Sequence, residues 1–291
     1  MVHVSDDRNH MATTFELRIA CPSEASRAAE RALADCHALI ETLEAGLTEF
    51  RQSSPVARLN SAKPFERVSL PETAWRLLED SRRIEELTGG AFSPSAKSAG
   101  AGLLASRFGL DSSARAAWRL DDGARLGFGA IGKGFALDRC RELLERAGFN
   151  HYLLSGGGSS VVLAGFADGA GSPWTWAWSW SRDAEGRDLG LELAHPTGSA
   201  IGIGVSGLHE KGEHLLDPRS GSRAAGMRSA LAGHPSAAWA DALSTALFVG
   251  GWEQALERFQ HALQPPALAM IDETGVPRWN GGFQALFGPI R

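Results

Sequence analysis

The chain has 291 residues, long enough for one large domain or two smaller ones with a sizeable core. With 43% hydrophobic and 22% charged residues, its composition is that of an ordinary globular protein. The net charge of −5 argues against binding to nucleic acid or to an anionic membrane, since both require clustered lysines and arginines. No run of about 18 apolar residues predicts a membrane-spanning helix. The N-terminus lacks the basic and apolar regions of a secretory signal, so we expect a cytoplasmic protein.

The first 47 residues predict an arm, a strand and a helix. Residues 1–10 are polar, and we expect a flexible N-terminal arm there, ahead of a domain that spans 11–291. Apolar and polar side chains alternate over 14–20, which predicts a half-buried strand. An alanine-rich amphipathic helix is predicted from about 24 to 47.

A second helix is predicted to start near residue 70 and to end at Gly89. Ser69 and Glu72 have the spacing of a capping box, and Pro71 is suited to the first turn. Further along, 118–129 predicts a hairpin that turns at Asp122 and Gly123.

The second half of the chain is richer in predicted strands. Four tryptophans in 173–180 alternate with small or polar residues, which places all four indoles on one face of a strand. Stacking of a flavin or sugar would use such a face, but we expect it to pack in a core. The other predicted elements are a helix closed by Gly148, two strands joined by glycines over 151–165, strands near 189–194, 200–206 and 228–232, helices at 237–251 and 252–263, and a hairpin from 267.

These elements predict a mixed α+β fold. Strands and helices interleave without the regular spacing of parallel β-α-β units, so we expect one unit of antiparallel strands with flanking helices, compact or two-lobed. The three cysteines, Cys21, Cys36 and Cys140, are odd in number and far apart, which predicts buried free thiols rather than disulfides or a zinc site.

The apolar helix predicted at 237–251 carries a polar stripe. Asp241, Ser244 and Thr245 have i, i+3 and i+4 spacing, so they share one face of the helix. In one interpretation, the two hydroxyls bond back to carbonyl groups one turn earlier and the helix dipole favours the carboxylate. In the other, Asp241 and Thr245 hold a hard cation such as Mg²⁺, which prefers oxygen ligands. The helix alone does not decide between them.

Two further segments carry residues suited to chemistry. His214 precedes a strong turn sequence at 217–221, and an imidazole can take a proton from a hydroxyl near neutral pH, although a lone histidine is more often structural. Asp217 is expected to cap that turn. Lys133 lies among glycines just before a predicted helix, an arrangement that can bind an anion but that matches no standard nucleotide motif.

Taken in order, six segments resemble the FAD:protein FMN transferases, the ApbE family. Each segment is a modest match by itself, but the ordered set extends from residue 11 to about 251. The segments are MATTFEL (11–17), SSPVARLN (53–60), TGGAFSPS (88–95), GAIGKGFALD (129–138), VSGLHEKGEHLLDPRSG (205–221) and DALSTALFVGG (241–251).

The resemblance implies Mg²⁺-dependent transfer of FMN from FAD to a Thr or Ser hydroxyl of an acceptor flavoprotein, with release of AMP. It implies that His214 is the catalytic base and that Lys133 lies near the phosphates. The implied metal ligands are the side chains of Asp241 and Thr245 and the main-chain oxygens of Ala130 and Ser244. The implied nucleotide contacts are Met11, Ala91, Phe92, Ser93 and Leu215.

The chain departs from the family pattern at several positions. Ala12 replaces a glycine, and Ser93, Gly127 and Ser159 stand where the family has carboxylates. Two other functions are therefore compatible with these residues. One is an FAD pyrophosphatase that yields free FMN and AMP, and the other is a non-catalytic flavin-binding protein.

Overall fold

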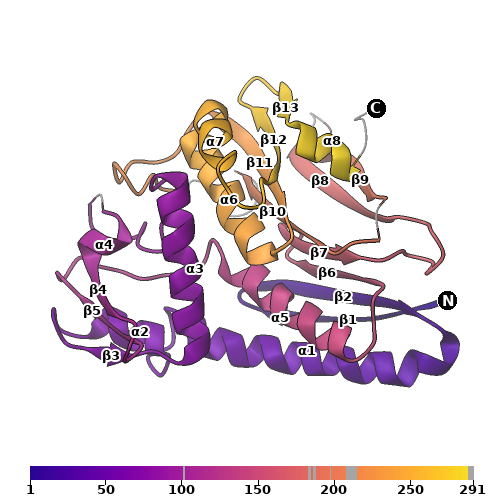
Figure 1. Ribbon diagram of the computed structural model, residues 1–291, viewed down its shortest axis with the longest axis horizontal. Helices are drawn as coiled ribbons and strands as arrows, with labels where there is room; N and C mark the ends of the chain where they lie inside the picture. Colours follow the sequence, from indigo (N-terminus) through magenta and orange to yellow (C-terminus); the bar gives the residue numbers. More distant parts are fainter. Residues whose placement is uncertain (101, 183–184, 186–187, 197, 208–214, 288–291) are drawn as a thin grey trace.

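The computed structural model describes residues 1–100, 102–182, 185, 188–196, 198–207 and 215–287 (Figure 1). Its main sheet has eight antiparallel strands in the order β1-β2-β6-β7-β10-β11-β12-β13. The strands are β1 (Val2–His10), β2 (Thr13–Cys21), β6 (Tyr152–Gly156), β7 (Ser160–Ala164), β10 (Ile201–Gly207), β11 (Met227–His234), β12 (Ala267–Asp272) and β13 (Pro277–Trp279). Within the described ranges, no helix is long and apolar enough to cross a membrane.

The polar residues expected to form a flexible arm instead form β1, an edge strand of this sheet. Every residue from Val2 to His10 pairs with a residue of β2. Most side chains of β1 are exposed. Main-chain hydrogen bonds, rather than apolar burial, therefore hold this strand in place, which is why its hydrophobic pattern does not reveal it.

Helices cover one face of the main sheet, as Figure 1 shows. Along each strand, alternate residues face this layer; Val162, for example, lies in the core beneath the helices, whereas Val161 lies in a second core on the opposite face. The principal helices are α1 (Ser26–Leu47), α3 (Glu72–Thr88), α5 (Gly132–Arg146), α6 (Ala237–Gly250) and α7 (Trp252–Phe259). All three cysteines are free and buried, as predicted.

The second core lies under a two-stranded ribbon and a short helix. The ribbon pairs β8 (Trp174–Arg182) with β9 (Asp188–His195), and α8 (Gly281–Phe287) packs beside it. Trp174 and Trp178 are buried in this core, and Trp176 and Trp180 pack against it half-buried. All four indoles therefore share one face of β8, as the period of two predicts. Helix α8 was not predicted.

A small three-stranded sheet lies beyond α3, at the left of Figure 1. Its order is β3-β5-β4. The strands are β3 (Val68–Ser69), β4 (Phe108–Asp111) and β5 (Ala116–Arg119), accompanied by α2 (Pro55–Ser61) and α4 (Leu104–Arg107), while a 3₁₀ turn, Ser23–Ala25, precedes α1. These elements, together with the main sheet and its helices, confirm the predicted α+β class.

The start of α3 differs from the prediction of a capping box. Pro71 is the N-cap residue and no side chain caps the helix, although the predicted end at Gly89 is correct. Ser69 cannot cap because it belongs to β3, where it pairs with Ala116. The tertiary pairing of the strand therefore overrides the local signal.

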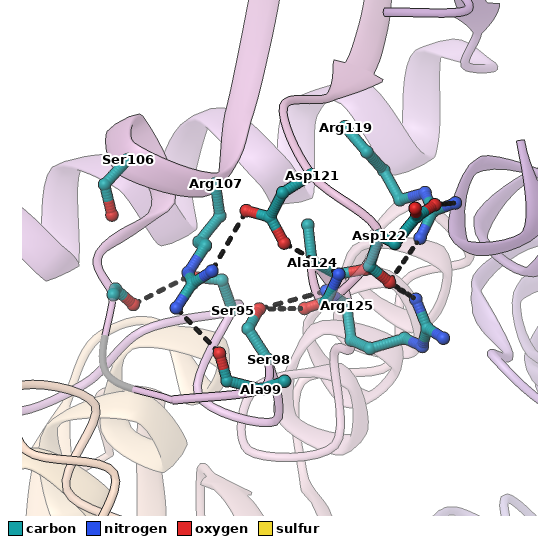
Figure 2. A network of polar contacts seen from close by, with 12 residues as sticks. Ser95, Ser98, Ala99, Ser106, Arg107, Arg119, Asp121, Asp122, Ala124 and Arg125 are labelled. Atoms are coloured by element: carbon teal, nitrogen blue, oxygen red, sulfur yellow. Dashed lines mark hydrogen bonds and ion pairs between the residues drawn. The ribbon is translucent and has the colours of Figure 1, made fainter. Parts of the chain in front are cut away.

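The second strand of the hairpin predicted over 118–129 is not formed. The turn is present, since Gly123 N–H donates to Asp121 Oδ1 at 2.7 Å, but no strand follows it. Figure 2 shows the reason: Arg119 bends back to donate to the carbonyl oxygen of Asp122, and the main chain at Arg125 bonds to Ser98 rather than to β5. Strand β5 pairs instead with β4 and β3, both of which precede it.

Helix α6 runs close to β10 because two glycines on that strand face it. A Cβ atom added at Gly202 would lie 2.5 Å from Ala237 Cα, and one added at Gly204 would lie 2.4 Å from the main chain of Ala240 and Asp241. Only glycine leaves room for the helix backbone here.

We predict that Gly204→Ala destabilises the protein by at least about 2 kcal/mol, because the added methyl group overlaps backbone atoms that cannot rotate away. The measurement is chemical denaturation of the metal-free protein. Gly46→Ala in α1 is the control, since nothing lies within 4 Å of its added Cβ. That control should leave stability unchanged or raise it by about 1 kcal/mol. Equal stabilities for the two variants would contradict the close approach of α6 to β10.

Candidate functional site

The site is built around α6, whose start is fixed by a carboxylate from α5. Asp138 accepts the N–H groups of Ala237 and Ala238, each at 3.0 Å, and the hydroxyl of Ser236 at 2.6 Å. A negative charge at this end also interacts favourably with the helix dipole. Gly134 of α5 lets the two helices touch, since an added Cβ would lie 2.1 Å from Ala237 O.

Asp241 is a buried carboxylate with one oxygen held and one free. Its Oδ2 accepts the main-chain N–H of Gly134 at 2.7 Å and the hydroxyl of Ser160, from β7, at 2.8 Å. Its Oδ1 is buried and finds no hydrogen-bond partner among the described residues. Burial raises the pKa of Asp241 to about 7, against the positive charge of Lys133, which lowers it. A cation at the free Oδ1 would stabilise the ionised form of this buried carboxylate.

The hydroxyls of α6 form a small network with β10. Ser244 and Thr245 donate back to Asp241 O at 2.8 and 3.2 Å, as the structural interpretation of the stripe expects. Ser206 of β10 lies 3.0 Å from both hydroxyl oxygens. Ser206 and Ser160 were not predicted from the sequence. The alternation Gly202, Gly204, Ser206 was the available signal, because it places Ser206 on the strand face that meets α6.

The N-terminus of α5 brings Lys133 to the same place. A Cβ built at Gly156, where β6 ends, would lie 3.7 Å from Lys133 Cβ. Lys133 is half-buried, and Ala130 lies just before the helix in a turn. The structure therefore brings Lys133, Asp241, Ser244 and Thr245 together at one end of the main sheet.

The residues expected to contact a nucleotide lie around this end of the sheet. Met11 forms the turn between β1 and β2 with φ of 51°, and its N–H donates to Glu44 at 2.9 Å. Ala91 and Phe92 are buried, and a Cβ built at Gly250, the last residue of α6, would lie 3.2 Å from Ala91 Cβ. Leu215 is half-buried against the main core.

A cavity of about 400 Å³ opens beyond the C-terminal end of α6. It is of the size that holds small ligands. Its lining comes from the end of α6, the start of α7 and strands β11 to β13, and it includes Phe248, Gly250, Trp252, Met270, Asp272 and Arg278.

The candidate base His214 lies in 208–214, outside the described residues, so its role stays a prediction. The turn that follows is present as expected: Asp217 Oδ1 accepts the N–H of Arg219 at 2.9 Å. Across the described ranges, no three or more His, Cys, Asp or Glu side chains form a group that could hold a metal. A cation at Asp241 would therefore be held by one carboxylate with hydroxyl and carbonyl oxygens, a donor set that suits Mg²⁺.

Ser93 and Gly127 stand where the family pattern leads us to expect a carboxylate, and each has a glutamate from another segment beside it. Glu85 of α3 hydrogen-bonds Ser93 and accepts Leu104 N–H at 3.0 Å; burial raises its pKa, and these bonds lower it. A Cβ built at Gly127 would lie 3.2 Å from Glu49 Oε1. Carboxylates are therefore present near both places, although they come from other elements.

The family model named ApbE matches residues 11–270 of the chain. No curated protein matches the chain significantly. Among solved structures, the flavin transferase ApbE from Vibrio cholerae superposes with a TM-score of 0.79 at 17% identity, over 98% of this chain and 99% of that one. The ApbE protein from Thermotoga maritima gives 0.81 at 19% identity, over 98% and 99%. The apo flavinyl transferase ApbE from Pseudomonas stutzeri gives 0.79 at 22% identity, over 99% and 97%.

We predict that the free energy of unfolding of the metal-free protein falls as the pH rises toward 7, because Asp241 loses its proton in the folded state. Because the pKa of Asp241 is raised in the folded state, that state binds the proton more tightly than the unfolded state does. The resulting stabilisation is complete below about pH 4 and is lost by about pH 7. In EDTA, Asp241→Asn should therefore gain stability relative to the unaltered protein between pH 5 and 8, by on the order of 2–4 kcal/mol. Denaturant unfolding at both pH values measures this, and a pH-independent difference would refute it.

Proposed function

The chain belongs to the ApbE family, and from that premise we propose that it transfers FMN from FAD to a Thr or Ser hydroxyl of an acceptor flavoprotein, releasing AMP. The observation that carries the proposal is the buried Asp241 carboxylate, whose Oδ1 lacks a partner among the described residues while Lys133 lies nearby. The names of the Vibrio and Pseudomonas structures support flavin transfer as the reaction.

A divalent cation fits the site through this free oxygen. Asp241 Oδ1, the Thr245 hydroxyl and the main-chain oxygens of Ala130 and Ser244 would hold Mg²⁺. Thr245 donates its own proton to Asp241 O, so the lone pairs of its oxygen remain available to a metal. When bound, the ion would neutralise charge on the FAD pyrophosphate. Ser206, 3.0 Å from Thr245 Oγ1, acts as a positioning residue for that hydroxyl.

The reaction replaces the phosphoanhydride linkage of FAD with a phosphodiester linkage to the acceptor. The acceptor hydroxyl oxygen bonds to the phosphorus of the FMN half, and the bond from that phosphorus to the oxygen of AMP breaks. His214 takes the hydroxyl proton, and Lys133 contributes positive charge near the phosphates. The cavity of about 400 Å³ at the end of α6, beside the Ala91 loop, supplies space for part of the dinucleotide. Met11, Phe92, Ser93 and Leu215 complete the proposed nucleotide contacts.

The reaction is tested by incubating the protein with FAD, Mg²⁺ and a candidate acceptor domain, followed by mass spectrometry and nucleotide analysis. We expect the mass of FMN on the acceptor and one AMP for each transfer. Free FMN with AMP would instead indicate an FAD pyrophosphatase, and retained, unchanged FAD would indicate a flavin-binding protein.

Asp241→Ala should abolish transfer, whereas Asp7→Ala, at an exposed position of β1, should not.

His214→Ala should lower the rate of transfer by about 10²–10⁴, the usual effect of removing a general base. FAD binding by this variant, measured by flavin fluorescence, should change little, because the imidazole acts on the acceptor proton. His261→Ala is the matched control, since His261 is exposed beyond α7. An undiminished rate in His214→Ala would exclude this residue as the base.

A further inference from the structure

A second cavity, of about 190 Å³, lies on the opposite face of the main sheet from Asp241. Ser160, the first residue of β7, points toward Asp241, whereas Ser159, in the turn just before β7, lines this cavity. The carbonyl of Ser159 accepts the N–H of Val205 at 2.7 Å, which keeps this residue in register with β10. Its side chain therefore faces the layer of the tryptophan ribbon.

Three indoles and one unpartnered hydroxyl line this cavity. Trp176, Trp178 and Trp180 contribute their rings from β8. Ser159 is 3% exposed, and its Oγ has no hydrogen-bond partner in the part of the chain that the structure describes. By contrast, the hydroxyl of Ser229, which also lines the cavity, accepts Trp178 Nε1–H at 2.9 Å. A buried hydroxyl without a partner costs stability unless a ligand or water completes it.

The size and lining of the cavity define what it can hold. An apolar cavity of about 150 Å³ binds one benzene molecule. The cavity beside β8 is slightly larger and offers aromatic walls on which a flat ring can stack. A ligand of one ring or two fused rings fits this volume, and a donor group on it can reach Ser159 Oγ.

We propose that this cavity is a binding site for a small aromatic molecule of one or two fused rings that stacks on Trp176 and donates an N–H or O–H hydrogen bond to Ser159 Oγ. The site is separate from the flavin nucleotide site because the sheet lies between it and Asp241. It does not depend on the proposed transfer reaction.

Indole and 1-methylindole are matched probes, because they share a ring system and only indole has an N–H donor. Calorimetric titration should show saturable binding of both to the full chain, with indole binding more tightly by about threefold to tenfold, the usual effect of one hydrogen bond. In Ser159→Ala, the two probes should bind equally. Trp176→Leu should weaken both, and Thr175→Ala, on the exposed face of β8, should weaken neither.

Thermal unfolding of each variant shows that it is folded, and Trp176→Phe replaces Trp176→Leu if the latter is not. Saturating FAD should leave indole binding unchanged, and displacement of indole by FAD would overturn the claim of a separate site. The absence of saturable binding, or a preference for indole that survives in Ser159→Ala, would overturn the proposal itself.

Discussion

The close approach of α6 to β10 and α5 is the constraint on which the site depends. Glycines at 134, 202 and 204 lack the Cβ atoms that would overlap the backbone of α6. At that separation, a main-chain N–H of α5 and a hydroxyl of β7 both reach Asp241 inside the core. Contacts among α6, α5 and β7 therefore hold the Asp241 carboxylate, which fixes the direction of the free Oδ1.

Helix α6 illustrates how much of the site the sequence predicts. The i, i+3, i+4 spacing places Asp241, Ser244 and Thr245 on one face, and they are on one face. The two interpretations of that stripe prove to be compatible: the hydroxyls bond back to the helix, while the carboxylate retains a free oxygen. The alternation with Gly202 and Gly204 marks the strand face of Ser206, but its contact with Ser244 depends on the register between β10 and a helix more than 30 positions away.

Elements that bury one face could be predicted from the spacing of their apolar residues, whereas elements held by other contacts could not. The tryptophans of β8 and the stripe of α1 face apolar cores, so their periods of two and 3.6 are visible in the sequence. The strand β1 and the segment after Asp122 are held by main-chain and arginine hydrogen bonds instead. Such bonds depend on where the partner lies in space, and no local period records them.

The exposed strand β1 has a consequence for contacts between copies of the chain. An edge strand offers unpaired main-chain groups to any other strand, and this invites sheet-to-sheet association. Asp6, Asp7 and Arg8 place charges in the middle of β1, and the opposite edge, β13, has three residues and begins with Pro277. Charge protects one edge of the sheet, while short length and a proline protect the other. Replacing the charges of β1 with apolar residues would convert this edge into a surface that pairs with β1 of a second copy, and the protected β13 edge would stop the assembly at two copies.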